Sequence, residues 1–420
     1  MTHPSGSLAP LRHKPFRYLA GGRVVTMLGN AIAPIALAFA VLDLTGSVRD
    51  LGLVVGARSL MAALFMVFGG VVADRLPRHL VLVVSSVLAA VSQATVATLV
   101  LTGAATIPWL VALSAVNGIV GSFAFPAGQA LIGQTVPDEL RQQANAINRL
   151  GMTTAMIAGA SVGGLLVATV GPGWGLAADA ATFALAGLAF AMVRVPGVRD
   201  RAVRSAGTLA ELREGWTEFV SRTWLWVVVL GFMFLNAAFA GGMGVLGPVV
   251  ADDTIGRSAW GFVLAANTAG MVLGAVVALR LRVRRLLFLG VVCMLGQVPL
   301  LLALAVEPAV ALLVPAAFAC GLAVEQFNIA WDTSVQRYVP EDKLARVYSY
   351  DALGSIIAVP IGQVAAGPVA LAMGTEAALL GAAAIVALAV VGMAASRGVR
   401  ELGREPTPIG ATPEPAPAVP

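Results

Sequence analysis

The chain alternates between long apolar runs and short polar breaks along almost its whole length. Most runs exceed 18 residues, and an α-helix of that length can cross a hydrocarbon core about 30 Å thick. Their Ala, Leu, Val and Gly content favours helices over a β-barrel, whose strands show shorter segments of alternating polarity. We therefore predict an all-α polytopic membrane protein with twelve transmembrane helices. The predicted spans are roughly 18–42, 50–73, 80–102, 108–133, 144–169, 173–194, 223–250, 258–280, 286–306, 308–331, 345–371 and 375–396.

The positions of the charges orient these spans. Only 12% of the residues are charged, against roughly 25% in a soluble domain, and the basic ones gather in alternate loops. The other loops carry only Arg49 and Arg257, so the positive-inside rule predicts a cell-membrane protein with both termini cytoplasmic. The net charge of +5 therefore reflects topology, and we expect no nucleic-acid partner. The cytoplasmic basic residues are Arg12, Lys14, Arg17, Arg75, Arg78, Arg141, Arg199, Arg201, Arg204, Arg213, Arg222, Arg282, Arg284, Arg285, Arg337, Lys343, Arg346, Arg397, Arg400 and Arg404.

One long polar segment divides the chain. Residues 195–222 form a predicted cytoplasmic interdomain loop, in which Thr208 and Glu211 match a capping box ahead of an amphipathic helix; a plain linker is the alternative. A Pro- and Ala-rich tail lacks the residues to build a core, so we predict that it is disordered. The five predicted parts are a cytoplasmic segment 1–17, a six-helix bundle 18–194, the loop 195–222, a second six-helix bundle 223–396 and a cytoplasmic tail 397–420.

The two halves repeat each other. The motif at 136–139, Val-Pro-Asp-Glu, returns at 339–342 as Val-Pro-Glu-Asp, an offset of 203 positions. The same offset aligns Gly118 with Gly321, and Leu150-Gly151 with Leu353-Gly354. Matched halves imply a pseudo-twofold axis along the membrane normal, with a path between the halves. This repeat indicates a transporter.

The link between the second and third spans carries a family motif. The loop signature G-x-x-x-D-R-x-G-R-[KR] of the major facilitator superfamily is matched by Gly70, Asp74, Arg75 and Arg78. On this motif the chain resembles that superfamily, over its length up to about residue 400. Segments 125–146 and 331–349 are similar to the branch that includes the enterobactin exporter and macrolide efflux pumps. The resemblance implies a major facilitator fold and export of a small molecule driven by a proton gradient.

Some motifs of drug–proton antiporters are absent. Ser114 stands where an arginine is usual in the fourth span, and Ala160 stands where a proline is usual in the fifth. The resemblance therefore supplies the family but no coupling residues.

Gly70, Asp74, Arg75 and Arg78 are the predicted gating loop. Asp74 can face the positive N-terminal end of a helix. The two arginines can pair with cytoplasmic carboxylates and form a latch that breaks when the protein opens inward. The alternative is that these arginines only fix the topology.

Three charges inside the spans are the candidates for proton coupling, because a charge in the membrane is costly unless it is paired or hydrated. Arg58 lies about 12 Å inside the second span, and Glu325 about 9 Å inside the tenth, at 1.5 Å per residue. Asp179 lies at a comparable depth in the sixth. Burial disfavours the charged form of a carboxylate, as a proton carrier requires, and Glu325 is the first candidate. The alternatives are a structural ion pair for Glu325, and an Arg58–Asp179 pair.

Polar neutral residues inside the spans are candidates for substrate contact. Four of them, Asn30, Asn117, Asn236 and Asn328, lie on the helices that line the cavity in this superfamily. The alternative for each is an interhelical hydrogen bond.

Several functions are excluded by missing motifs. The chain has no G-x-x-x-x-G-K-[ST] loop, no H-E-x-x-H pair and no G-x-S-x-G elbow, and its three histidines are scattered. We therefore expect no enzyme, cofactor or metal site. The expected partners are a small-molecule substrate, protons and membrane lipid, and the expected state is a monomer. The leading hypothesis is a secondary active exporter of a small amphipathic molecule (a drug, a macrolide-like compound or a siderophore). The alternatives are a nutrient importer or uniporter of the same superfamily, and a non-transporting receptor or scramblase.

Overall fold

The computed structural model describes residues 8–194, 219–278, 280, 283–339 and 341–403. Within the helices, the side chains of 67–75, 125–126, 130, 138, 341–346, 348–350, 352–353 and 356 also lie outside the described part. The described chain is helical and contains no strand.

The first half contains six long helices and two short 3₁₀ turns. These are η1 (Ala9–Arg12), α1 (Lys14–Thr45), α2 (Val48–Arg75), α3 (Arg78–Leu101), α4 (Ile107–Thr135), η2 (Asp138–Leu140), α5 (Arg141–Val170) and α6 (Pro172–Ala191). In the second half several membrane-length segments are divided into shorter helices. Its elements are α8 (Thr223–Gly241), the π-helical η3 (Gly242–Leu246), α9 (Gly247–Asp253), α10 (Arg257–Ala278), α11 (Leu286–Cys293), the 3₁₀ turn η4 (Met294–Gly296), α12 (Gln297–Val306), α13 (Val310–Tyr338), α14 (Glu341–Met373), α15 (Thr375–Ala395) and α16 (Arg397–Glu401).

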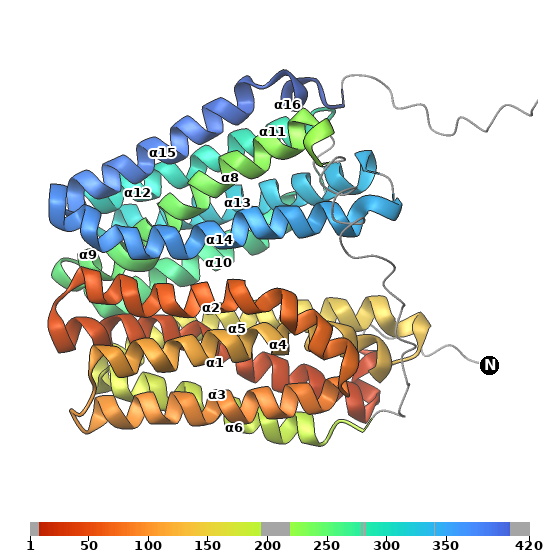
Figure 1. Cartoon of the computed structure of the whole chain (residues 1–420), viewed down its shortest axis with the longest axis vertical. Coiled ribbons are helices and arrows are strands. Elements are labelled where there is room, and N and C mark those ends of the chain that lie inside the picture. The colour runs from red at the N-terminus through yellow and green to blue at the C-terminus, as the bar shows by residue number, and fades with distance from the viewer. Residues whose placement is uncertain (1–7, 195–218, 279, 281–282, 340, 404–420) are drawn as a thin grey trace, which may run out of the picture.

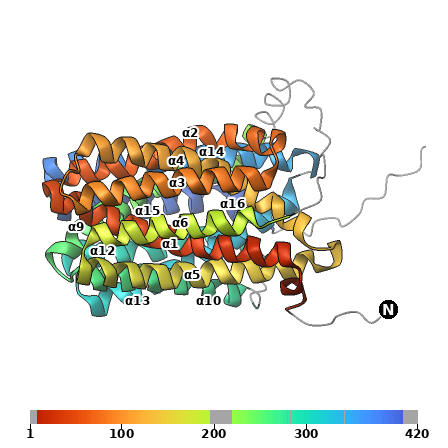
Figure 2. The ribbon, with the colours of Figure 1, turned by 90° about the horizontal axis from the view of Figure 1, so that it is seen from below.

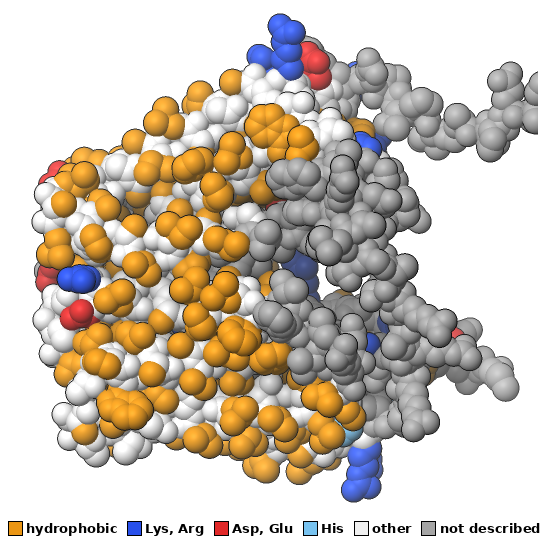
Figure 3. Space-filling model, viewed as in Figure 1, with side chains coloured by type: hydrophobic (Ala, Val, Ile, Leu, Met, Phe, Trp, Pro, Cys, Tyr) orange, Lys and Arg blue, Asp and Glu red, His pale blue; other side chains and the backbone are white. Residues whose placement is uncertain are grey.

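Ten helical segments among the described residues are long and apolar enough to cross a membrane. Two further helices, α2 and α14, are as long as these but are described only in part. Together they match the twelve predicted spans in order and approximate length. The face shown in Figure 3 is covered mostly by apolar side chains, and the charged side chains on it lie mainly at its margins. The polytopic all-α prediction is therefore confirmed.

The helices form two bundles that Figure 1 shows one above the other. In the first, α1 packs against α5 and α6, and α3 packs against α4 and α6; Figure 2 shows these helices from the underside. The second bundle repeats the pairing, with α8 against α14 and α15, and α12 against α13 and α15. Equivalent helices therefore pack alike in the two halves.

Glycines at the predicted repeat positions make equivalent contacts. A methyl group at Gly118 in α4 would overlap the backbone carbonyl of Arg58 in α2, and one at Gly321 in α13 would overlap that of Asn267 in α10. Without side chains at these positions, the helix backbones can approach closely. The sequence repeat therefore corresponds to a structural one, and Asn267 occupies the place in the second bundle that Arg58 occupies in the first.

The contact between the bundles is also duplicated. Gly52 of α2 lies against the carbonyl of Gln363 in α14, and Gly261 of α10 lies against the carbonyl of Ala160 in α5. All these contacts lie toward the end of the molecule where α1 finishes at Thr45, which we call the distal end. The ribbons separate toward the opposite end, where α1 begins and α16 lies (Figure 1); we call this the terminal end.

Two prolines divide spans of the second bundle. Pro248 follows the π-helical turn η3, and Pro299 follows the 3₁₀ turn η4. Proline has no N–H and its ring crowds the carbonyl four residues earlier, so the regular hydrogen-bond ladder is lost there. The break at η4 places Met294 and Gln297 on the wall of a cavity described below.

Several predicted boundaries differ from the structure. Helix α2 runs to Arg75 and α3 starts at Arg78, so the link between them is only Leu76 and Pro77. The tail predicted to be disordered from 397 onward begins instead with helix α16, which is stabilised by its buried Val399. Most of the predicted interdomain loop 195–222, which includes the predicted amphipathic helix, lies outside the described residues, as does the tail beyond 403.

Candidate functional site

A cavity of about 180 Å³ lies inside the first bundle. Helices α1, α2, α3, α4 and α6 surround it, and Met152 of α5 reaches it. Its polar wall contains two arginines, Arg23 and Arg58, and two of the predicted substrate residues, Asn30 and Asn117. Serines of α3 add hydroxyl groups. The described charged groups on the wall of this first-bundle cavity are therefore both cationic hydrogen-bond donors.

Arg58 is held by a neutral partner. Its Nη2 donates a hydrogen bond to Oδ1 of Asn30 at 3.1 Å. Asn117 is buried on the neighbouring helix, and its amide Nδ2 has no hydrogen-bond partner in the described structure. The structure therefore brings Arg58, Asn30 and Asn117 together around one cavity, and it leaves one amide donor available.

Asp179 lies at the centre of the same bundle and is fully buried. Its Oδ2 accepts a hydrogen bond from Nε2 of Gln93, while Oδ1 has no hydrogen-bond partner among the described residues. Gly29 of α1 packs directly over this carboxylate, where any side chain would overlap it. Asp179 also interacts electrostatically with Arg58, although no direct ion pair joins these two described side chains. The two opposite charges therefore attract each other, while each side chain has its own neutral hydrogen-bond partner.

Arg23 is a residue of this cavity that the sequence analysis missed. Its Nη1 donates to the carbonyl of Gly128 at 3.0 Å and to Oε1 of Gln129 at 3.3 Å. The side chain is buried near the terminal end of α1. The sequence could have identified Arg23, because it lies inside the first apolar run and a charge in a membrane span is costly without partners.

A second cavity, of about 320 Å³, lies inside the second bundle. Helices α8, α10, α13 and α14 and the break around η4 surround it. It contains the other two predicted substrate residues, Asn236 and Asn328. Nδ2 of Asn236 donates to the carbonyl of Ser355 at 3.5 Å, whereas Asn328 is exposed. The predicted substrate residues therefore divide evenly between the two cavities.

Aromatic rings and one carboxylate dominate this second-bundle cavity. Phe327 stacks on Phe232, with ring centroids 4.0 Å apart, and on Trp331 at 6.1 Å. Nε1 of Trp331 donates to Oδ2 of Asp351 at 2.9 Å, and Ser355 donates to Oδ1 at 3.4 Å. None of the described side chains that line it is an arginine or a lysine.

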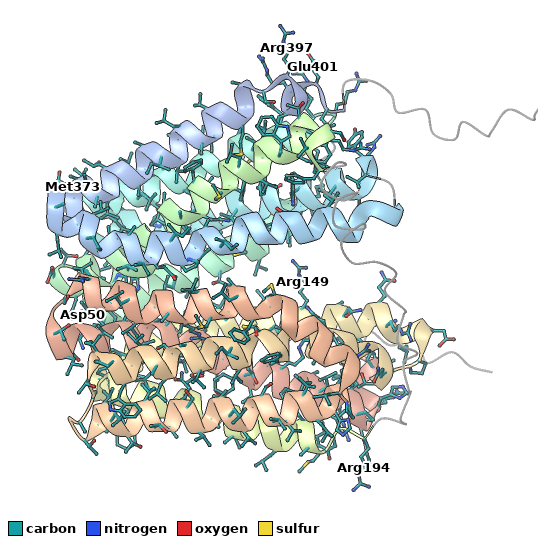
Figure 4. All side chains as sticks on the ribbon, viewed as in Figure 1. Asp50, Arg149, Arg194, Met373, Arg397 and Glu401 are labelled. Carbon is teal, nitrogen blue, oxygen red and sulfur yellow. The ribbon has the colours of Figure 1, made fainter. Side chains whose placement is uncertain are left out.

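Glu325 forms an ion pair between the bundles. Its Oε1 lies 3.3 Å from Nη2 of Arg149 in α5. The glutamate side chain is only 6% exposed, whereas that of Arg149 is 81% exposed, and Figure 4 shows the arginine in the space between the bundles. An exposed pair contributes little to stability. Arg149, which the sequence analysis missed, also stands inside a predicted span.

A second ion-pair cluster joins the bundles at the distal end. Arg257, the first residue of α10, pairs with Asp43 at the end of α1 and with Asp252 of α9. Its guanidinium also lies 4.8 Å from the ring centroid of Phe39. A planar guanidinium can serve two carboxylates at once. This distal cluster was not predicted, because its partners lie 214 positions apart in the chain.

Most of the predicted gating loop lies outside the described side chains. This applies to Gly70, Asp74 and Arg75, whose backbone belongs to the last turns of α2. Arg78 starts α3, is half-buried and has an interaction partner. The gating role of these residues stays a prediction.

The comparisons with known proteins identify the family. The sequence model of the Major Facilitator Superfamily matches residues 19–351. The chain belongs to the Major Facilitator Superfamily. The multidrug efflux pump Tap of Mycolicibacterium fortuitum is 27% identical over 367 residues, which make up 84% of this chain and 88% of that protein. The resemblance inferred from the loop motif is confirmed.

Solved structures share the fold at low identity. The nucleoside transporter NupG has a TM-score of 0.72 and 15% identity, covering 90% of this chain and 98% of its own. A bacterial homologue of the iron transporter ferroportin in an inward-facing state has a TM-score of 0.70 and 18% identity, covering 91% and 98%. The protein is therefore a multi-pass transporter of the Major Facilitator Superfamily and not an enzyme.

Proposed function

We propose that the protein is a secondary active transporter that exports a small amphipathic molecule by alternating access, coupled to protons. The relative named as a multidrug efflux pump supports export, since it is similar along most of both chains. The observation that carries the proposal is the Arg149–Glu325 ion pair, in which a buried carboxylate of one bundle faces an exposed arginine of the other.

The sidedness follows from the distribution of charge. The basic starts of α1, α3 and α5 and the basic end of α13 all lie at the terminal end, and we infer that this end is cytoplasmic. The distal end then faces outward, in a cell membrane. In the state described here, the glycine contacts and the distal cluster hold the bundles together at the distal end, and a substrate for export would enter from the opposite, terminal end.

Alternating access requires the distal cluster to break. Opening the distal end separates Asp43 from Arg257, because these residues belong to different bundles. Opening the terminal end leaves that pair intact. The cluster therefore favours the state described here, by about 1 kcal/mol for a partly exposed pair. A contribution of that size biases a two-state equilibrium without locking it.

Proton coupling is assigned to Glu325. Protonation would remove its charge and its attraction for Arg149, so that the bundles lose one connection on the cytoplasmic side of the midplane. Release of the proton would restore it. Asp179 and Arg58 are the second candidates; their network lies within one bundle, so its protonation would change the first-bundle cavity and no contact between bundles. The neutral asparagines Asn30, Asn117, Asn236 and Asn328 would then contact the substrate in the two cavities.

The first experiment tests export itself. Overexpression in a strain without its own pumps should confer resistance to at least one inhibitor, and a protonophore should abolish the resistance. Growth that depends on one nutrient would instead indicate an importer, and pH-independent movement of lipid between leaflets a scramblase.

The second experiment tests coupling in proteoliposomes with an inhibitor found in that screen. Glu325→Gln should reduce inhibitor-dependent proton flux to the level of empty vesicles, since it removes the protonatable group and keeps the shape. Glu307→Gln is the matched control, because Glu307 is exposed at the distal end and away from the ion pair. Unchanged flux in Glu325→Gln would rule out the assigned role.

A further inference from the structure

The second-bundle cavity has the chemistry of a cation site. Asp351 is the one charged side chain among the described residues that line it, so the described wall carries a carboxylate and no cation. By contrast, the first-bundle cavity contains Arg23 and Arg58. The two cavities therefore favour opposite charges.

The carboxylate of Asp351 retains acceptor capacity. Each oxygen accepts one hydrogen bond, from Trp331 and from Ser355, whereas an ionised carboxylate has about four lone-pair sites. A second acceptor lines the same cavity, because Oε1 of Gln297 has no hydrogen-bond partner among the described residues although the side chain is only 3% exposed. The η4 break places this residue on the cavity wall. A buried acceptor without a partner is unfavourable until a donor reaches it.

Aromatic rings supply the rest of the wall. Phe232, Phe239, Phe327 and Trp331 all line the cavity. Phe327 is held between Phe232 and Trp331, and Trp224 supports Trp331 from the side at 5.8 Å between ring centroids. This stack fixes the orientation of the rings before a ligand arrives. A ring face attracts a cation within about 6 Å of its centroid, and the apolar surface accommodates organic substituents.

We propose that this second-bundle cavity binds an organic cation, an amine, quaternary ammonium or phosphonium centre with apolar or aromatic substituents. Asp351 neutralises the charge, Phe232 and its neighbours surround the substituents, and Gln297 accepts a hydrogen bond when the centre carries an N–H. Asn328, which also lines the cavity, is exposed. The claim that organic cations are the exported substrates rests on the proposed function. The claim that the cavity binds an organic cation rests on the cavity alone.

The test measures binding of tetraphenylphosphonium to the purified full-length protein in detergent. Equilibrium dialysis with the radiolabelled cation should give saturable binding by the unaltered protein. Neutral triphenylphosphine oxide at equal concentration should not displace it, because it lacks the cationic charge. Asp351→Asn should weaken binding roughly tenfold, the effect of losing one partly shielded charge contact.

The matched control for the charge is Asp332→Asn. Asp332 is exposed and neighbours Asp351 but does not line the cavity, so its loss should change the affinity by less than about twofold. An asparagine at 351 can still accept the hydrogen bond from Trp331, which preserves the packing. Size-exclusion profiles and melting temperatures verify that both variants are folded.

A second variant tests the aromatic wall independently of Asp351. Phe232→Leu keeps an apolar side chain and removes the ring, and it should weaken tetraphenylphosphonium binding by roughly threefold to tenfold. Phe234→Leu is its control, because Phe234 lies on the same helix and is 53% exposed, outside the cavity.

The outcomes separate the binding site from the transport function. Absence of saturable binding, or equal affinity in Asp351→Asn and Asp332→Asn, would overturn the cation site, whatever the resistance assay shows. Binding that depends on Asp351 and Phe232 supports the site even if cells gain no resistance, and only the proposed export would then fail.

Discussion

The two bundles have the same architecture but their cavities have opposite chemistry. Arg58 and Asn267 occupy equivalent places, each with its backbone against a glycine of the next helix. Arg58 brings a positive charge into the first cavity, whereas Asn267 brings a neutral amide that donates to the carbonyl of Ala317 at 3.1 Å. The comparison shows that backbone packing preserves the repeat, while side chains facing the cavities are free to diverge.

The divergence extends to the outer helices of each bundle. The fully buried Asp179 of α6 lies near Arg58, but the equivalent helix α15 has its acidic residue, Glu376, only in its first turn. Aromatic rings and Asp351 are gathered in the second bundle instead. An amphipathic substrate between such bundles would meet donors on one side and a carboxylate with rings on the other.

The largest expected change in stability comes from replacing Arg58 with methionine, compared with the same replacement of its counterpart Asn267. Arg58→Met leaves Asp179 buried without its compensating charge and should destabilise the protein by about 3 kcal/mol. Asn267→Met loses one hydrogen bond and should cost about 1 kcal/mol. Thermal unfolding of both variants in the same detergent measures the difference. Equal costs would mean that the charge of Arg58 has no structural role.

The next prediction concerns the close helix contacts that the two bundles share. Gly118→Ala and Gly321→Ala should each destabilise by about 1–3 kcal/mol, because the added methyl group overlaps a backbone carbonyl. The control is Gly121→Ala, one turn along α4, where a methyl group would meet open space. The same thermal assay compares all three variants. A large difference between the first two would show that the two close contacts are not energetically equivalent.

The smallest effect concerns the distal cluster, whose Arg257–Asp43 ion pair joins the two bundles at the distal end. Arg257→Gln should leave the folded protein nearly as stable but raise the population open at the distal end several-fold, for a contribution of about 1 kcal/mol. Spin labels at Ser47→Cys and Thr254→Cys, with Cys293 and Cys320 replaced by serine, report the distance between the bundles there.

The control for the distal cluster is Arg49→Gln, which removes the other basic residue of the distal loops. It should leave the distribution of distances unchanged. A distribution that is likewise unchanged in Arg257→Gln would contradict the role of the cluster in keeping the distal end closed.

Much of the fold could be predicted from local pattern. Apolar runs of membrane length gave the helices in order, and the 203-residue offset aligned Gly118 with Gly321, which make equivalent close contacts in the structure. Boundaries were less predictable, because Pro77 allows a link of two residues between α2 and α3. The breaks at η3 and η4 were not predicted, although Pro248 and Pro299 mark them in the sequence.

The candidate site was predictable only in part. Each polar residue inside an apolar run could be recognised as unusual, and Asn30, Asn117, Asn236 and Asn328 do line cavities. Their partners could not be recognised. Arg149 and Glu325 lie 176 positions apart, and no periodicity within one helix specifies which residue of another helix it will meet.

The sequence by itself determined the membrane class, the order of the helices and the doubling of the fold, because hydropathy and glycine spacing act locally along each helix. The tertiary structure alone decided which charges meet, where the cavities lie and that one cavity is donor-rich while the other is acidic and aromatic. These properties depend on the rotation and crossing of packed helices, which bring together side chains from distant parts of the chain.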